Sequence, residues 1–475
     1  MLTCVMVGRT GRNHICTMDN GVLDSLLVRK YNQPVPRYTS YPTVPFWKND
    51  IPPIQWQQTF SERFHTCNAA SGISIYIHLP FCESLCTYCG CNKKITTNHS
   101  VEEEYLQTIG EEWQLYRKLM GETPVVREIH LGGGTPTFFS PQNLRRLVST
   151  ITRSSVVHPH FEFSIEGHPN NTTKEHLATL FSLGFRRISF GVQDLDPAVQ
   201  RIINRIQPLE NVRQASENAR NAGFESINFD LIYGLPLQTL HGIENTIEQV
   251  ISLRPDRIAF YSYAHVPWTS RGQRLFDERD LPAPDEKIQL YLAGKKLLMA
   301  NGYRDIGMDH FSLVTDGLYK AKVNGTLNRN FMGYTTQHTG LLLGLGVSAI
   351  SDLGDAFAQN EKALHEYYGR IQEKKLAVKR GVFLSGEDKA FSRYIRDISC
   401  NGQTMFLPEH LEILEQYCFP RFQQLADDGL IEYGKTFLKL TPKGHYFIRN
   451  VCSCLDLYLQ RGDSFTGQQT FSKAI

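Results

Sequence analysis

The chain has 475 residues, of which 41% are hydrophobic and 21% are charged, and its formal net charge is +2. This length allows two or three domains with a large core, and a near-neutral charge gives no electrostatic reason to expect nucleic acid or a membrane surface as a partner. No apolar run reaches membrane-spanning length, and the first residues lack the apolar core of a secretion signal. Eleven cysteines fit a reducing compartment better than a disulfide framework, so we expect a cytoplasmic protein.

The composition of the first part of the chain predicts an N-terminal arm that precedes the main domain. We assign residues 18–70 to this arm. Its segment Pro34–Thr43 is rich in proline and tyrosine, which predicts an ordered but irregular conformation rather than a helix.

Four cysteines follow within ten residues, in the pattern C-x3-C-x2-C-x-C: Cys82, Cys86, Cys89 and Cys91. Closely spaced thiolates suit zinc or an iron–sulfur cluster. No CxxC pair or Cys/His group recurs at zinc-finger distance, which favours the cluster, although a structural zinc knuckle stays open as an alternative. The first three cysteines can hold three irons of a 4Fe–4S cube and leave the fourth iron open for a small molecule. Cys91 is then a thiol beside the cluster or facing a substrate, or merely a small buried side chain.

From about residue 70 apolar strands alternate with amphipathic helices, which predicts an α/β fold with a parallel sheet. Repetition of this unit predicts a partial (β/α)6, TIM-like barrel over residues 71–375. The expected strands are Ile73–Leu79, Glu128–Leu131, Phe161–Glu166, Arg187–Val192, Ser226–Tyr233 and Arg257–Tyr263. The expected helices are Val101–Met120, Pro141–Ser154, Lys174–Leu183, Glu210–Ala222 and Ile243–Leu253. Glycines after helical runs, such as Gly184 and Gly223, predict that these helices end at a glycine in the left-handed backbone conformation.

Polar or glycine-rich groups recur at the carboxyl ends of these strands, where barrels of this type place their chemistry. The run Gly132–Pro136 exposes backbone that a ligand can approach, although a plain turn is the alternative. Glu166 suits a cationic ligand group, unless it is only a solvated carboxylate at a strand end. Asp230 suits ribose hydroxyls, or caps a helix. Gln193 and Arg205 suit a carboxylate, or Arg205 makes a surface ion pair.

The last hundred residues, 376–475, predict a mainly helical domain that resembles a winged helix. Helical stretches such as Pro408–Tyr417 precede a β-hairpin that turns near Gly434–Lys435, and a helix is expected after the hairpin, to about Arg461. Winged helices often bind DNA, but no basic cluster supports that function here, and we favour a structural role or a lid over the substrate.

The C-x3-C-x2-C core, with Tyr88 before its last cysteine, resembles the radical S-adenosylmethionine (SAM) superfamily. Longer segments narrow the resemblance to the oxygen-independent coproporphyrinogen III oxidase family. They include Pro36–Thr43, Cys86–Lys93, Gly191–Asp194, Phe229–Pro236, Tyr263–His265, Gly307–Phe311, Arg329–Phe331, Gly333–Gln337 and Gly346–Ser351. The likeness runs from about residue 25 to the C-terminus. Heme-chaperone-like relatives usually have phenylalanine at the position of Cys91.

The resemblance implies that the propionates on rings A and B of coproporphyrinogen III are oxidatively decarboxylated to vinyl groups. A 5′-deoxyadenosyl radical from SAM removes a hydrogen atom, and the substrate radical then loses CO2 and one electron. The resemblance also implies a 4Fe–4S cluster on Cys82, Cys86 and Cys89, two SAM molecules, and a reduced electron donor such as flavodoxin. We expect no nucleic acid, no membrane, and a monomer.

Residue by residue, the family pattern implies contacts to both SAM molecules. Those to the first are Tyr76, Gly133, Glu166, Ala264 and Ile350. Those to the second are Gly134, Thr135, Gln193, Arg205 and Asp230. Tyr88 is expected near the adenine, and the candidate catalytic residues are Cys91 and Tyr76.

The chain departs from the family pattern at Gly167–His168, after Gln337 and around Asn401–Met405. Residues 1–17 match nothing in the family, so we expect a non-native extension with translation beginning at Met18. Two other functions stay open: a heme-binding or heme-modifying relative, and a zinc-bearing nucleic-acid module built on the C-terminal domain.

Overall fold

The computed structural model describes residues 25–462 and 471–474. Within these ranges no helix is both long and apolar enough to cross a membrane. The expected extension at residues 1–17 and the expected start at Met18 lie outside the described residues.

The centre of the molecule is a curved parallel sheet, and all of its predicted strands are confirmed. In spatial order they are β2 (Ile73–Leu79), β5 (Val125–Gly133), β6 (Val156–Gly167), β7 (Phe185–Gln193), β8 (Ser226–Tyr233) and β9 (Arg257–Ser262). Each pairs in parallel with the next, so their carboxyl ends meet at one rim.

The sheet is wider than the sequence predicted, with 13 strands in the described part of the chain. A further parallel strand, β14 (Leu342–Leu345), pairs with β2. Beyond it run the antiparallel strands β15 (Ile350–Asp352), β16 (Ala356–Asn360), β17 (Val378–Phe383) and β1 (Lys48–Asn49). At the other edge, β11 (His310–Leu313) and β10 (Tyr303–Gly307) follow β9. The α/β class is therefore confirmed, and the parallel barrel is open and extended at both edges.

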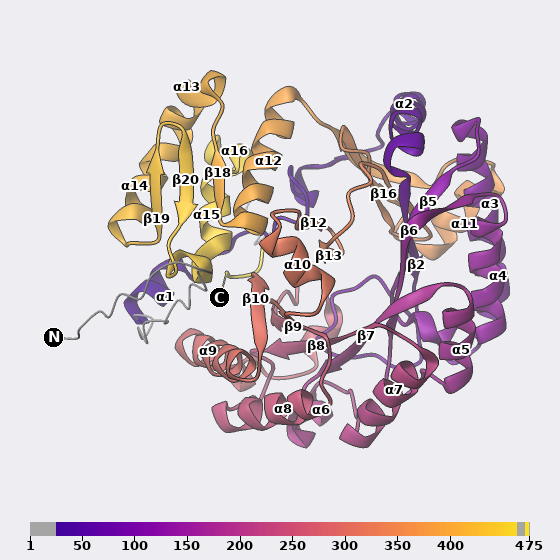
Figure 1. Cartoon of the computed structure of the whole chain (residues 1–475), viewed down its shortest axis with the longest axis horizontal. Helices are drawn as coiled ribbons and strands as arrows, with labels where there is room; N and C mark the ends of the chain where they lie inside the picture. Colours follow the sequence, from indigo (N-terminus) through magenta and orange to yellow (C-terminus); the bar gives the residue numbers. More distant parts are fainter. Residues whose placement is uncertain (1–24, 463–470, 475) are drawn as a thin grey trace, which may run out of the picture.

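Helices cover the convex side of the sheet (Figure 1). The apolar side chains of the strands, such as Ile129, Phe190 and Phe229, are fully buried. Along this arc lie α3 (Val101–Met120), α4 (Pro141–Thr152), α5 (Lys174–Ser182), α6 (Pro197–Ile202), α7 (Leu209–Ala222), α8 (Leu240–Ser252) and α9 (Pro284–Ala300). The predicted helices are confirmed to within a few residues at their ends. Gly223 ends α7 with φ of 99°, in the left-handed conformation that its position predicted.

The concave side of the sheet is polar, because alternate residues of each strand face the interior of the barrel. On β7 these residues are Arg187 and Ser189, and on β8 they are Asn228 and Asp230. The helix α10 (Gly317–Val323) and the hairpin of β12 (Asn328–Asn330) and β13 (Gly333–Thr335) lie on this side (Figure 1). The barrel therefore encloses polar groups rather than a packed apolar core.

The arm is irregular over Pro34–Thr43 as predicted, but helices flank this stretch. They are α1 (Ser25–Tyr31) and the long α2 (Pro53–Ser71), whose buried Trp56, Phe60 and Phe64 pack into the main core. Arg449 ties the arm to the other end of the chain, since it donates to the carbonyls of Val35 and Pro36 and to those of Lys473 and Ala474. An antiparallel bridge joins Pro34 to Lys473.

The C-terminal part packs at the open side of the barrel (Figure 1). It follows α11 (Leu364–Gln372) and contains α12 (Gly386–Asn401), α13 (Leu411–Ile413), a π-helix (Leu414–Cys418) and α14 (Phe419–Asp427). The predicted hairpin is confirmed as β19 (Ile431–Gly434) and β20 (Phe437–Leu440), with β18 (Gln403–Met405) beside β20. The expected final helix is wrong: three short helices, Gly444–Phe447, α15 (Ile448–Cys454) and α16 (Leu457–Gln460), replace it. The Asp456 side chain accepts from the Leu459 N–H and starts a new helix there.

Candidate active site

The cysteine loop is fixed at both ends and along its length. The short strand β3 (Phe81–Cys82) pairs with β4 (Lys94–Ile95) and closes the loop between them. Outside partners hold the loop backbone: the Asn204 amide donates to the Leu85 carbonyl at 2.8 Å, and the Ser270 hydroxyl donates to the Cys89 carbonyl at 2.8 Å. The loop therefore has a defined shape, which it needs if several of its thiolates are to bind one metal cluster.

Positive charge and thiol hydrogen bonds surround the cysteines. Arg205 Nη1 lies 3.5 Å from Cys86 Sγ, and Thr135 Oγ1 donates to Cys82 Sγ at 3.3 Å. The Cys91 thiol hydrogen-bonds to the Cys89 thiol and lowers the pKa of Cys89 to about 6. Thiolates are the ligand form of cysteine, so this environment suits metal binding. Cys91 is exposed, so the reading of it as a small buried side chain is wrong.

The glycine run after β5 packs against the cysteine loop without room for side chains. A Cβ atom at Gly134 would lie 2.5 Å from the Pro80 carbonyl oxygen and 3.0 Å from Cys82 Sγ. Gly133 has φ of 123°, which favours glycine, and its N–H donates to Glu166 Oε2 at 3.2 Å. These positions form a cradle of bare backbone beside the first cysteine.

Glu166 stands at the end of β6 next to this cradle. Burial alone would raise its pKa, but the nearby His130 and the Gly133 N–H outweigh burial and hold the pKa below its usual value. His130 Nε2 lies 3.4 Å from Glu166 Oε1, and His130 Nδ1 shares a 2.7 Å hydrogen bond with Ser164. Glu166 is therefore an oriented carboxylate suited to a cationic group.

A second polar group lies across the site at the ends of β7 and β8. Arg205 Nη2 donates to the Gly191 carbonyl at 2.6 Å, while its Nε is buried without a hydrogen-bond partner among the described residues. Gln193 has φ of 66°, a strained value for a residue with a side chain that is typical of functional sites. Ser189 and Asn228 donate hydrogen bonds to Asp230. Burial, and then the charge of Glu166, raise the pKa of Asp230 to about 6. Asp230 lies within β8, so its interpretation as a helix-capping residue is wrong.

These groups line one cavity of about 990 Å3. The predicted residues that line it are Cys82, Cys86, Tyr88, Cys89, Cys91, Gly133, Gly134, Thr135, Glu166, Gln193, Arg205 and Asp230. Carboxylates, a guanidinium and bare glycine backbone thus face a space large enough for small-molecule cofactors.

The other predicted residues, Tyr76, Ala264 and Ile350, do not line this cavity. Tyr76 stacks on His130 with ring centroids 5.8 Å apart. The Ile350 backbone packs on Gly344, the neighbour of Tyr76 in the sheet. The Ala264 carbonyl accepts from Gln273, whose amide also donates to the Tyr88 carbonyl at 2.8 Å.

Sequence reasoning missed two histidines of the site. His78 Nδ1 lies 3.0 Å from the Tyr76 hydroxyl, and its Nε2 lies 2.9 Å from the Asn92 carbonyl beyond the last cysteine. His130 orients Glu166. In β2, His78 lies two positions after the predicted Tyr76, and in β5, His130 lies two positions before Gly132. Residues two positions apart share a strand face, so this alternation could have identified both histidines.

The departure at His168 changes the loop after β6. His168 lines the cavity, where burial and then Arg205 lower its pKa to about 3 and keep it neutral. Its Nδ1 accepts from the Asn170 N–H, so a side-chain-to-backbone hydrogen bond closes this loop without a carboxylate at position 168.

The spacing of the thiols bears on the kind of metal group that the site suits. Within residues 25–462 and 471–474 no group of three or more histidine, cysteine, aspartate or glutamate side chains converges on one ion. A four-iron cube binds each thiolate at a different iron, so its ligands stand farther apart than those of zinc. The glycine cradle, the lowered pKa of Cys89 and the spare Arg205 Nε fit a cluster with an anionic ligand beside it.

Comparison with known proteins places the chain in a superfamily of enzymes. Residues 76–250 match the radical SAM superfamily, and this segment holds the cysteine loop, the glycine cradle and Asp230. The chain is 37% identical over 460 residues to the oxygen-independent coproporphyrinogen III oxidase of Pseudomonas aeruginosa, covering 95% of this chain and 98% of the relative. The Helicobacter pylori relative of the same name is 38% identical, with coverage of 94% and 98%.

A solved structure agrees. The coproporphyrinogen III oxidase of Escherichia coli, described as a radical SAM enzyme, aligns with a TM-score of 0.84 at 36% identity, over 91% of this chain and 98% of that one. The chain therefore belongs to the oxygen-independent coproporphyrinogen III oxidase family.

Proposed function

We propose that this protein converts coproporphyrinogen III to protoporphyrinogen IX without oxygen, by oxidative decarboxylation of the propionates on rings A and B. One observation carries the proposal. A single cavity collects the cysteine loop, the glycine cradle and the Gln193–Arg205–Asp230 group. Relatives that bear the name of this activity match the chain over 98% of their own length.

In this proposal Cys82, Cys86 and Cys89 hold a 4Fe–4S cluster. Three thiolates leave one coordination position for a chelating ligand, and a fourth from Cys91 would fill it. Cys91 is instead the residue that tunes the Cys89 thiol, to which it hydrogen-bonds. When bound, the cluster and SAM supply the one-electron chemistry that removes a hydrogen atom from the substrate.

The remaining residues bind and orient two SAM molecules. Glu166 carries the negative charge that suits an ammonium group, and its neighbours Gly133 and Tyr76, with Ala264 and Ile350, complete the first site. At the second site Asp230 accepts from ribose hydroxyls, while Arg205 pairs with a carboxylate. Gly134, Thr135 and Gln193 belong to this second site, and Tyr88 lies against adenine.

The chain also positions the substrate and excludes water from the reaction. The C-terminal part at the open side of the barrel suits a lid for this purpose. A reduced donor such as flavodoxin supplies electrons, and the protein acts as a cytoplasmic monomer.

An anaerobic turnover assay tests the proposal. The protein is reconstituted with iron and sulfide, then given a strong reductant, SAM and coproporphyrinogen III, and the porphyrin is followed by mass. Two successive losses of CO2 and two hydrogens, together with 5′-deoxyadenosine, are expected. Formation of 5′-deoxyadenosine with an unchanged porphyrin would refute the substrate and retain only the radical SAM class.

A further inference from the structure

A second, smaller cavity of about 110 Å3 lies inside the barrel. It adjoins the cofactor cavity, because Glu166, Ser189, Asp230 and Tyr261 line both. One water molecule requires roughly 10–15 Å3, so this cavity holds a group of a few heavy atoms but not a tetrapyrrole. A substituent of a larger molecule bound in the cofactor cavity can enter this smaller cavity.

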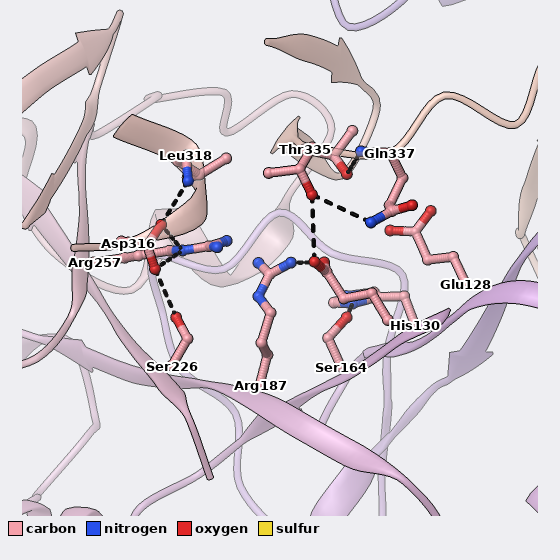
Figure 2. Close-up of polar contacts among 12 residues, drawn as sticks. Glu128, His130, Ser164, Arg187, Ser226, Arg257, Asp316, Leu318, Thr335 and Gln337 are labelled. Atoms are coloured by element: carbon pink, nitrogen blue, oxygen red, sulfur yellow. Dashed lines mark hydrogen bonds and ion pairs between the residues drawn. The ribbon is translucent and has the colours of Figure 1, made fainter. Parts of the chain in front are cut away.

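Two arginines line this cavity from the amino ends of their strands, and Figure 2 shows their guanidinium groups facing each other. Arg257 donates to Asp316 through Nε alone, at 2.8 Å to each carboxylate oxygen. Arg187 pairs with Glu162 through Nη1. Among the described residues, no hydrogen bond uses either Nη of Arg257, or Nε and Nη2 of Arg187. Both guanidinium groups therefore retain donors for a further acceptor.

His310 adds a third donor to the same cavity. Its Nδ1 is buried and has no hydrogen-bond partner among the described residues, while its Nε2 lies 3.4 Å from the Tyr261 hydroxyl. Burial, and then Arg329 and Arg257, lower the pKa of His310 to about 3, so the ring is neutral. When Nε2 accepts from Tyr261, the proton lies on Nδ1 and is available to a ligand.

The unused donors around this cavity, rather than its net charge, suit an anion, because nearby carboxylates balance the two arginines. Burial and then the neighbouring Arg257 lower the pKa of Arg187 to about 9, which reflects the cost of two cations held side by side. Of the nearby carboxylates, Glu162 and Asp316 each pair with one arginine, and Glu166 and Asp230 lie on the wall shared with the cofactor cavity. A planar carboxylate between the two guanidinium groups would satisfy their free donors.

We propose that this arginine pocket, defined by Arg187, Arg257 and His310, binds a substrate propionate that is not decarboxylated. The inference rests on the proposed function, which supplies a substrate with several propionates. A carboxylate held by two arginines loses those interactions when it leaves as neutral CO2, so the pocket would oppose loss of the group that it binds. The arginine pocket therefore anchors one unreactive propionate of the substrate and presents another propionate to the cofactor cavity.

The test compares two double variants that each neutralise one ion pair. E162Q/R187Q removes both charges of the pocket pair and leaves no unpaired buried charge. The control E103Q/R146Q removes an exposed pair between α3 and α4, with the same chemistry and the same change in charge. Iron content and SAM affinity, measured on both, report whether the cofactor site is intact. A third variant, H310L, removes the free Nδ1 donor without touching an ion pair.

We expect E162Q/R187Q to raise the KM for coproporphyrinogen III, and the Kd for oxidised coproporphyrin III, by about tenfold to a hundredfold. The control should match the wild type, and H310L should show a smaller increase. Wild-type KM and Kd in both E162Q/R187Q and H310L would overturn the carboxylate site while leaving the proposed function standing. Absence of turnover by the wild type would instead overturn the proposed function, and this inference with it.

Discussion

Replacing Gly134 with alanine tests whether the glycine cradle sets the position of the first cysteine. The new Cβ would lie 2.5 Å from the Pro80 carbonyl oxygen, which must retreat by about 0.9 Å to reach an ordinary contact of 3.4 Å. That carbonyl accepts from the Lys94 N–H at 2.8 Å, a hydrogen bond that closes the cysteine loop. The same Cβ would lie 3.0 Å from Cys82 Sγ. Overpacking of this kind costs about 1–3 kcal/mol, and here it also displaces a proposed cluster ligand.

Gly134→Ala should therefore lower both the iron content and the free energy of unfolding. Iron and sulfide are measured after anaerobic reconstitution, and stability is measured by denaturant unfolding of the cluster-free protein. Gly386→Ala is the control, because nothing lies within 4 Å of its added Cβ and its φ is not positive. If Gly134→Ala binds iron as the wild type does and unfolds at the same denaturant concentration, the cradle does not constrain Cys82.

Two further predictions follow from the site. Cys82→Ser, Cys86→Ser and Cys89→Ser should each abolish the cluster absorbance, whereas Cys91→Ser should retain it; equal iron loss in all four would refute the ligand assignment. Asp230→Asn should stabilise the cluster-free protein at pH 8 by up to about 3 kcal/mol, since the raised pKa of about 6 makes ionisation costlier in the folded than in the unfolded state. This gain should shrink as the pH falls below about 6 and vanish only below about 3, where the carboxyl is protonated in both the folded and the unfolded state. A gain that is independent of pH in urea titrations would contradict the prediction.

The sequence predicted the elements whose signal is local. The strands of the parallel sheet and the helices between them carry strong periodicity, and their residue types mark the rim where the cavity lies. The strand Leu342–Leu345 was hidden because it is short and lies between Gly340 and Gly346, which together look like a turn. Helix α2 could have been found, since Trp56, Phe60 and Phe64 repeat at helical spacing.

Interactions across long sequence distances were beyond such reasoning. Nothing local connects Arg257 with Asp316, 59 residues later, yet this buried ion pair helps to define the arginine pocket. Even over two residues the folded shape decides: Cys91 was recognised as the extra cysteine from its spacing, but its hydrogen bond to Cys89 depends on the shape of the folded loop. Tertiary packing fixes these contacts, and spacing along the chain cannot predict them.

The clamp that Arg449 forms on the arm has a consequence for synthesis of the protein. Val35 lies 414 residues before Arg449, so at about 5–20 residues per second the arm waits roughly 20 to 80 seconds for its partner to emerge from the ribosome. The strands of the barrel can pair with their sequence neighbours during that interval, whereas the carbonyls of Val35 and Pro36 still lack Arg449. A ribosome that stops before codon 449 would leave Val35 and Pro36 without Arg449, although Arg329 would still bind the neighbouring carbonyls of Arg37 and Tyr38. Proteolysis of the segment before Arg37 would then be favoured.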